Sequence, residues 1–311
     1  MGTHAPDINV FRVFTVVVCS VIGGGGITLY ALQRFTSQDL TKVVRTYRSW
    51  LIMAPLPVIG ILLGREAAIL HNSTLALFVF REFAKATKLE NDRRMSLVCQ
   101  AAIVVQSLTV LATDPNTGAN GWYGLFMTLP VFVIGAFHLV PILGNRVEGQ
   151  LRTVSLAVFG YLYFGWMFGH LGFLTNLENG RIYLLYLLFA VSIGDVSAYA
   201  FGKLFGKRQL RSNISPNKTV AGSVGALAVS MALPWLMRFA LPGFGTTELL
   251  ITGLIVGVGG QVGDLTVSYI KRDLQIKDMG QLIPGHGGLL DRVDSLVFTA
   301  PLFFHMIRWF A

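Results

Sequence analysis

Residues 13–32 read VFTVVVCSVIGGGGITLYAL, an uncharged and largely apolar run. An α-helix needs roughly 17 to 25 such residues to cross the hydrocarbon core of a bilayer. The run therefore predicts a membrane-spanning helix over 10–32. A signal peptide is the alternative, because Arg12 precedes the run, but no A-x-A cleavage pattern follows and VVVC at 16–19 is a poor lipoprotein signal. We expect a retained first span.

Further apolar runs of similar length follow along the chain. With 53% hydrophobic and 13% charged side chains in 311 residues, the chain has more apolar surface than a soluble core can bury. The predicted spans are 10–32, 48–64, 67–84, 95–113, 121–142, 151–173, 181–204, 220–240, 245–267 and 293–310. The expected fold class is all-α, a polytopic integral membrane protein of about ten transmembrane helices in one domain over 1–311. The short second and third spans should form a tight hairpin through Gly64, Arg65 and Glu66.

The 25 Lys and Arg residues are unevenly distributed among the loops. Most of them fall in alternate loops, at 34–48, 85–94, 146–152, 203–218 and 271–292. This alternation is the positive-inside pattern, and it predicts that the polar loops 203–219 and 268–292 are cytoplasmic and that the amino terminus lies outside. The net charge of +9 therefore indicates orientation in the membrane. We expect no nucleic-acid partner, because no soluble basic domain is present to form a binding groove.

Two carboxylates, Asp195 and Asp264, fall within otherwise apolar predicted spans. An ionised carboxylate is costly at membrane depth unless it meets a cation or a water-filled cavity, so each indicates function by default. Asp195 has a structural alternative, a buried ion pair with a Lys or Arg on a helix. Asp264 is harder to explain structurally, because it follows the glycine-rich run GVGGQVG at 257–263 and precedes Lys271 by about two helical turns.

The same part of the chain carries oxygen ligands and cations together. Three carboxylates suit Mg²⁺, which binds hard oxygen ligands and usually keeps substrate phosphates and waters: Asp264, Asp291 and Asp294. Three cations suit phosphate oxygens: Lys218, Lys271 and Arg272. Glycines at 285, 287 and 288 would let backbone amides approach an anion. The residues predict a phosphate and metal site where the helices meet the cytoplasmic boundary.

The spacing of Asp291 and Asp294 supports this site. If the last helix begins near 291, residues three apart share a face, and both carboxylates lie at a helix amino terminus, where the helix dipole favours negative charge. Simpler interpretations remain for other polar residues: the basic residues 207–211 suit membrane anchoring, and His286 suits a polar turn. No Ser-His-Asp order, Cys-His pair or H-E-x-x-H motif supports hydrolysis by a nucleophilic triad or a zinc-bound water.

Four stretches together resemble a known family. They are DVSAYAFGKLFGK (195–207), ISPNKT (214–219), SYIKRDLQIKD (268–278) and LIPGHGGLLDRVD (282–294). They resemble the signature of bacterial phosphatidate cytidylyltransferases, also called CDP-diacylglycerol synthases, over about 190–296. The part before 180 is similar only in style, as a run of short apolar helices with REF from Arg81. The resemblance thus places a catalytic core at 190–296, with the signature at 268–294, after divergent amino-terminal helices.

The resemblance implies conversion of CTP and phosphatidic acid to CDP-diacylglycerol and pyrophosphate at the cytoplasmic leaflet of the inner (plasma) membrane. It also implies Mg²⁺ as cofactor, with room for a second cation, and a homodimer as a common assembly. It assigns Asp264 and Asp291 to the metal and Asp294 to a nearby acidic position. It assigns phosphate contacts to Ser268, Lys271 and Arg272, and it matches Ser215, Pro216, Lys218 and Thr219, with Asp195 and Tyr199, to segments expected near substrate. His286, Gly287 and Gly288 are candidate substrate contacts because they belong to the glycine turn described above.

Two positions depart from the family pattern. Ala221 and Val267 stand where the family usually has acidic residues. Their loss would weaken or relocate a second cation, or mark a diverged paralogue with a different lipid acceptor. Because Asp264, Asp291 and the basic pair at 271–272 are retained, we expect an active enzyme.

Two other functions remain open from the sequence. In a transporter, Asp195 and Asp264 would handle protons or ions and the glycine-rich helix would give alternating access, although no internal inverted repeat is seen. Within enzymes, a cytidylyltransferase or CTP-dependent kinase acting on another lipid would differ only in its acceptor.

Overall fold

The computed structural model describes residues 8–35, 40–281, 283 and 287–310. In chain order its α-helices are α1 (Ile8–Phe35), α2 (Thr41–Met53), α3 (Pro55–Leu63), α4 (Arg65–Ala86), α5 (Arg93–Leu111), α6 (Tyr123–Leu143), α7 (Gln150–Gly160), α8 (Phe168–Leu174), α9 (Gly180–Phe205), α10 (Val220–Leu236), α11 (Thr246–Leu254), α12 (Gly260–Asp273) and α13 (Leu290–Phe310). Short 3₁₀ turns η1 (Leu89–Asn91) and η3 (Arg238–Ala240) follow α4 and α10. Two π-helical segments, η2 (Tyr161–Met167) and η4 (Ile255–Gly259), join α7 to α8 and α11 to α12.

The predicted spans correspond to these helices, and four of them are composite, including 220–240, which covers α10 and η3. The span 48–64 is divided between α2 and α3, because Pro55 begins a new helix and has no amide hydrogen to donate. The spans 151–173 and 245–267 each contain a π-helical segment. In the described part of the chain, seven helical stretches are long and apolar enough to cross a membrane, and α10 is apolar but shorter. The protein is thus a helical integral membrane protein.

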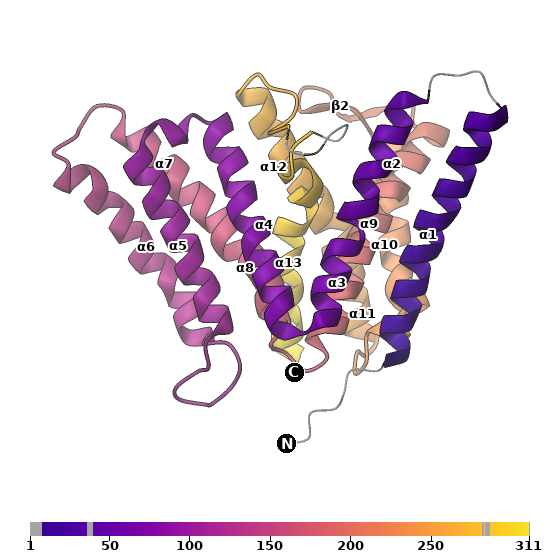
Figure 1. Ribbon diagram of the computed structural model, residues 1–311, viewed down its shortest axis with the longest axis horizontal. Coiled ribbons are helices and arrows are strands. Elements are labelled where there is room, and N and C mark those ends of the chain that lie inside the picture. The colour runs from indigo at the N-terminus through magenta and orange to yellow at the C-terminus, as the bar shows by residue number, and fades with distance from the viewer. Residues whose placement is uncertain (1–7, 36–39, 282, 284–286, 311) are drawn as a thin grey trace.

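The helices alternate in direction, so the loops gather at two ends (Figure 1). Helices α1, α4, α6, α9 and α12 all end at the upper face in the figure, whereas α3, α5, α8 and α10 end at the lower face, where α1 begins and α13 finishes. The loops that carry most of the basic residues therefore lie at one end. That distribution is the one that the positive-inside pattern requires.

The hairpin between the second and third spans turns at Gly64, as predicted. This residue has φ +125° and ψ −175°, a conformation that a side chain makes unfavourable, and α4 begins at the next residue. At the opposite face, the chain between α9 and α10 adds an element that the all-α prediction lacks. Strands β1 (Gln209–Arg211) and β2 (Ser215–Thr219) pair antiparallel, with Gln209 opposite Thr219.

An aromatic core joins the two halves of the chain. Its largest fully buried side chains include Phe80, Phe83, Phe126, Phe137, Tyr161, Phe164, Phe168, Tyr186, Phe303 and Phe304. These residues lie on α4, α6, η2, α8, α9 and α13, and α4, η2, α8 and α9 pack against α13, so the last helix is held in the middle of the molecule. By contrast, α1 exposes Val16, Val21 and Ile27, as expected of a helix that faces lipid.

Candidate active site

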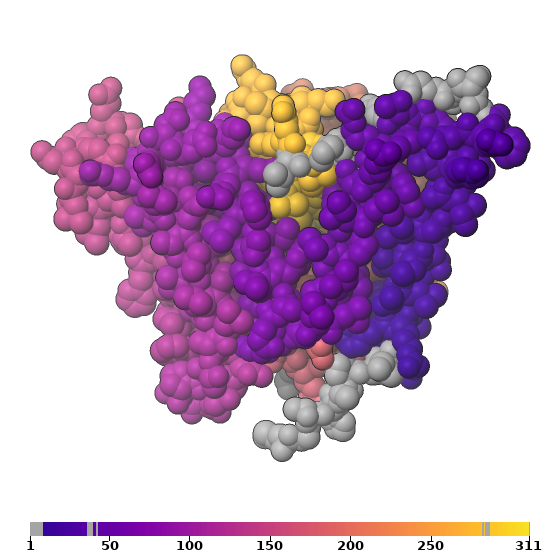
Figure 2. Space-filling view, in the orientation of Figure 1, coloured from indigo at the N-terminus to yellow at the C-terminus, as the bar shows by residue number. Residues whose placement is uncertain are grey.

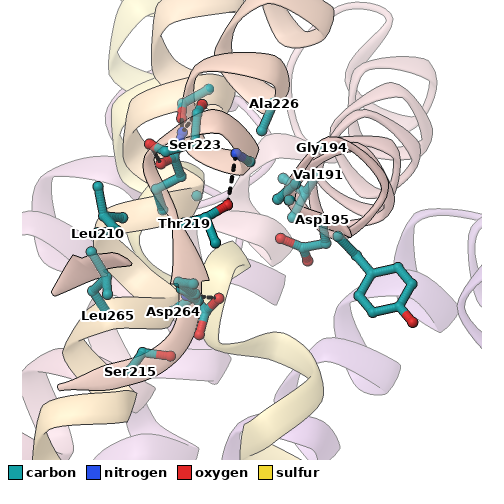
Figure 3. Close-up of a pocket in the computed structure, with 18 of the residues that line it drawn as sticks. Val191, Gly194, Asp195, Leu210, Ser215, Thr219, Ser223, Ala226, Asp264 and Leu265 are labelled. Atoms are coloured by element: carbon teal, nitrogen blue, oxygen red, sulfur yellow. Dashed lines mark hydrogen bonds and ion pairs between the residues drawn. The ribbon is translucent and has the colours of Figure 1, made fainter. Parts of the chain in front are cut away.

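A cavity of about 500 Å³ lies between α9, β2, α10, η4, α12 and the start of α13. Its charged and polar lining comes from segments far apart in the chain and comprises Asp195, Lys203, Ser215, Asn217, Lys218, Thr219, Ser223, Ser230, Gln261, Asp264, Asp291, Arg292 and Asp294, with Tyr199 beside them. Figure 3 shows the carboxylates of Asp195 and Asp264 reaching into this space from two different helices, with Thr219 nearby. Most of the predicted site residues therefore meet in one cavity.

Small residues allow the helices around the cavity to pack closely. A Cβ at Gly222 of α10 would collide with the carbonyl oxygen of Ala198 in α9. A Cβ at Gly263 of α12 would collide with the carbonyl oxygen of Asp294 in α13. Close approach through small residues is the usual way in which membrane helices pack. Here it brings carboxylates on α9, α12 and α13 to the same space.

The π-helical segment η4 sets the direction of α12. It covers Ile255–Gly259, part of the glycine-rich run before Asp264, and such insertions often lie at functional sites. Gln261 follows it: its Nε2 donates to the carbonyl oxygens of Gly257, at 2.7 Å, and of Ser223, at 3.1 Å. Gln261 thereby joins α12 to α10. Gln261 was not among the residues predicted from the sequence. A polar amide in an apolar helix, three residues before Asp264, could have indicated it.

Lys218 and Asp264 form the first of two ion pairs. The ammonium of Lys218, on β2, contacts Oδ2 of Asp264, on α12, and both side chains are about 30% exposed. The hydroxyl of Ser268 lies 3.4 Å from Oδ1 of the same aspartate. The β-hairpin thus brings a cation to an intramembrane carboxylate. This contact unites two motifs that are separate in the sequence.

Lys271 and Asp291 form the second ion pair, with 2.7 Å between Nζ and Oδ1. The other oxygen, Oδ2, accepts hydrogen bonds from the amides of Met279 and Gly288, each at 3.0 Å. The Asp291 side chain is only 5% exposed. Asp291 therefore ties α12 and both ends of the α12–α13 connection to the first turn of α13.

Asp195 and Asp294 complete the acidic lining. Oδ1 of Asp294 accepts from the amide of Ser295 at 2.8 Å, and the hydroxyl of Ser295 lies 3.5 Å from Oδ1 of Asp195. Both carboxylates are electrostatic neighbours of Asp264. Lys218 pairs with Asp264 and Lys271 with Asp291, and Asp195 belongs to neither of these two ion pairs. The cavity lining thus combines four carboxylates with the cations Lys203, Lys218 and Arg292, a set that suits phosphate groups bound together with a metal cation.

Some predicted residues lie around the cavity instead of lining it. Arg272 is exposed, and its Nε donates to the carbonyl oxygen of Ile214, at 3.3 Å, in the β-hairpin. Ser268 and Lys271 do not line the cavity, but they contact Asp264 and Asp291, which do. Gly287 adopts φ +81° and its carbonyl oxygen accepts from the amide of Ile283. His286, with Gly285, lies outside the described residues.

Metal ligation at this site would depend on the substrate. In the described part of the chain, no three His, Cys, Asp or Glu side chains are arranged to enclose one ion. Asp264 has one oxygen next to Lys218 and the other only weakly engaged by Ser268. A hard cation bound there would take further ligands from phosphates and water, as Mg²⁺ usually does. The acidic set fits such a cation, whereas Asp291 would have to release an existing partner to serve as a ligand.

The two positions that depart from the family pattern differ in environment. Val267 has 0% exposure and belongs to the hydrophobic core. Ala221 is half-buried in the first turn of α10, next to the Thr219 cap of that helix. Because Ala221 and Val267 are apolar, the carboxylates that line the described cavity are those of Asp195, Asp264, Asp291 and Asp294.

Comparison with known proteins identifies similar sequences along most of the chain. The model of the cytidylyltransferase family matches residues 44–310. A phosphatidate cytidylyltransferase of Staphylococcus haemolyticus is 30% identical over 79% of this chain and 94% of its own length. One of Staphylococcus aureus is 41% identical over 51% of this chain and 60% of its own length. YnbB, an uncharacterized protein of Escherichia coli K12, is 38% identical over 60% of this chain and 63% of its own length. The matches to the last two thus span less than two thirds of those proteins.

Proposed function

Because the chain belongs to the cytidylyltransferase family, we propose that it transfers the cytidylyl group of CTP to phosphatidic acid, giving CDP-diacylglycerol and pyrophosphate in phospholipid biosynthesis. The observation that carries this proposal is the cavity in which Asp264, Asp291 and Asp294 meet Lys218 at one end of the helices. Two similar proteins are phosphatidate cytidylyltransferases by name.

The reaction needs positioning and charge neutralisation more than a strong base. The phosphate monoester of the lipid is already an anionic nucleophile at neutral pH. One of its oxygens attacks the α-phosphorus of CTP, the bond from that phosphorus to the bridging oxygen breaks, and pyrophosphate leaves with the electron pair. Lys218 and Lys271 are held at the site by their aspartate partners, from which they can turn to phosphate oxygens. Such fixed cations stabilise the charge that develops on the leaving group.

A divalent cation belongs to the same proposal. Mg²⁺ bound through Asp264, with Asp291 as the second protein ligand, would neutralise the pyrophosphate as it leaves. Asp195 and Asp294 supply the remaining negative charge around this position and are where a second cation would be bound. Ser215 and Thr219, on β2, face the cavity from the side of the β-hairpin and are proposed to contact substrate.

The orientation in the membrane follows from the charge pattern. We propose that the chain crosses the inner membrane ten times, with the face at which α9 and α12 end in the cytoplasm and the amino terminus outside. CTP would enter from the cytoplasm, and the lipid headgroup would reach the cavity where the helices end. A homodimer, as the family resemblance implies, is the proposed assembly.

A second candidate keeps the chemistry and changes the acceptor. Ala221 and Val267 replace acids that the resembled signature usually carries, which favours a diverged cytidylyltransferase or CTP-dependent kinase for another lipid, while the retained Asp264 and Asp291 favour an enzyme over a non-enzymatic role. The lipid acceptor is therefore the part of the proposal that the assay must vary.

The test uses purified protein in detergent with Mg²⁺, labelled CTP and phosphatidic acid. Formation of a labelled CDP-lipid is expected, and Asp264→Asn should abolish it because the carboxylate is lost with little change in shape. Asp114→Asn, in the α5–α6 loop at the opposite end of the molecule, is the matched control and should retain full activity. If the wild type makes no CDP-lipid with any of a panel of lipid phosphates and divalent metals, the proposed function is refuted.

A further inference from the structure

Glu82 lies in α4, far from the signature segments in sequence, yet it contacts the start of α13. Its Oε2 accepts a hydrogen bond of 2.8 Å from the amide of Leu290, the first residue of that helix. The first amides of a helix have no partner within the helix, and a carboxylate at this position also interacts favourably with the helix dipole. Glu82 therefore acts as a cap that is supplied by a different helix.

The α12–α13 connection packs tightly around this carboxylate. A Cβ at Gly288 would lie 2.7 Å from Oε2 of Glu82, and a Cβ at Gly280 would collide with Oε1. Any side chain at these two positions would force the carboxylate away. Figure 2 shows the connection, in yellow, lying beside the purple end of α4. The glycines thus serve a purpose beyond turn formation, because they admit Glu82 to the amino terminus of α13.

Placing the Glu82 carboxylate here costs folding free energy, because one of its oxygens is buried. Oε1 of Glu82 is buried and has no hydrogen-bond partner among the residues that the structure describes. A buried polar atom without a partner destabilises the fold, and a buried charge does so more strongly. Glu82 itself is half-buried, so the cost falls on this one carboxylate oxygen. The contact with Leu290 is the observed compensation.

The contact leads directly to the site residues. Leu290 precedes Asp291, whose Oδ2 accepts from Met279 and Gly288 and whose Oδ1 is 2.7 Å from Lys271. Two carboxylates, one from α4 and one from α13, thus hold the first turn of α13 and both ends of the connection. A change at Glu82 would shift Asp291, and with it Lys271.

We propose that Glu82 is a positioning residue for cytidylyl transfer: it fixes the amino terminus of α13 so that Asp291 and Lys271 are correctly placed at the cavity. This rests on the function proposed above. Glu82 does not line the described cavity, so it acts through its neighbours and not on the substrate. The amino-terminal half of the chain would then contribute to the site as well as to the membrane anchor.

The test compares three variants of the full-length protein in detergent. Glu82→Ala removes both oxygens, and Glu82→Gln keeps one acceptor for Leu290. The control Asn72→Ala removes another buried polar side chain from α4, about 15 Å away along the helix axis. Two quantities are measured on folded protein: kcat with the KM for CTP, and hydrogen exchange of the amides in 279–292 without substrate.

The expected results separate positioning from general stability. Glu82→Ala should lower kcat by roughly tenfold to a hundredfold, as small displacements of reacting groups do, and should speed exchange mainly within 279–292. Glu82→Gln should keep most of the protection and most of kcat, and Asn72→Ala should change neither. The proposal is overturned if folded Glu82→Ala keeps the wild-type kcat, if Glu82→Gln exchanges as fast as Glu82→Ala, or if faster exchange spreads over the whole chain. A wild type without CDP-lipid activity would refute the proposed function instead, while the exchange measurement would still decide whether Glu82 holds α13.

Discussion

At the scale of single residues, the two lysines of the site each neutralise one aspartate. Lys218 pairs with Asp264 and Lys271 with Asp291, so each of these partly or largely buried charges lies next to an opposite charge. Removing one member of such a pair leaves the other uncompensated, which usually costs more than the pair contributes. The pairs therefore make the site stable before substrate binds, and they keep the cations close to where phosphates are expected.

Position 267 gives a prediction at this scale. Val267 is fully buried in the core, so Val267→Glu would place a charge among apolar side chains and is expected to destabilise the fold by about 3 to 5 kcal/mol. Val267→Thr, which keeps the shape and replaces one methyl group with a hydroxyl, should cost less. Thermal unfolding in detergent measures both. A Val267→Glu protein that is as stable as the wild type and binds Mn²⁺ more tightly would show that this position belongs to a metal site.

At the scale of elements, the site depends on how α12 leaves the π-helical segment η4. A π-helical turn contains one residue more than an α-helical turn, so it changes which face of the following helix points to the cavity. Asp264, Ser268 and Lys271 follow η4 at helical spacing and share a face. Gln261 then holds this orientation through its hydrogen bonds to Gly257 and Ser223. One local insertion thereby sets the direction of several site residues together.

Deleting one residue of η4 tests this dependence. Because a π-helical turn accommodates one extra residue, removal of Val258 should convert the segment to regular α-helix and leave the direction of α12 nearly unchanged. Asp264 should then stay beside Lys218 and CDP-lipid formation should be retained, whereas removal of Val262 from the regular helix α12 should turn the residues after it by about 100° and abolish the reaction. Deletion of Val131, which is 72% exposed on α6, is the control for shortening a membrane helix. Loss of activity in a folded protein without Val258 would mean that the wide π-helical turn itself, and not only the direction of α12, is required at the site.

At the scale of the whole molecule, the alternation of helix direction gathers the functional loops. The β-hairpin before α10 and the connection before α13 lie at the same face (Figure 1), although most of α10 to α12 separates them in the chain. An even number of crossings between two loops returns the chain to the same side of a membrane. The predicted topology and the meeting of Lys218 with Asp264 are thus linked.

Side-specific labelling tests that topology. In a chain with Cys19 and Cys99 replaced, Asn213→Cys in the β-hairpin should react with a membrane-impermeant thiol reagent only after the inner membrane is opened. Asn116→Cys, in the exposed loop between α5 and α6, should react in cells in which only the outer barrier is permeable. The two loops lie at opposite faces of the molecule. The reverse pattern of reactivity would contradict the predicted orientation.

The sequence by itself determined the class of the protein and the approximate positions of its helices, and it predicted many of the residues that line the cavity. Apolar runs of membrane-spanning length and alternating basic loops are properties of the chain alone, because lipid requires each spanning segment to satisfy its own backbone hydrogen bonds. The signature segments likewise place Asp264, Lys271 and Asp291 without knowledge of their contacts. Hydrophobicity alone could not predict the helix breaks at Pro55 and within the glycine-rich run, because it does not distinguish a continuous span from an interrupted one.

Only the tertiary structure decided which residues pair. Lys218 with Asp264, Gln261 with Ser223 and Glu82 with Leu290 are contacts between segments that periodicity and composition treat as independent. Glu82 also looks like an ordinary polar residue near the end of a helix until the glycines at 280 and 288 are seen to admit it. Such pairings depend on the direction and close approach of packed helices, and these follow from the shapes of many side chains at once.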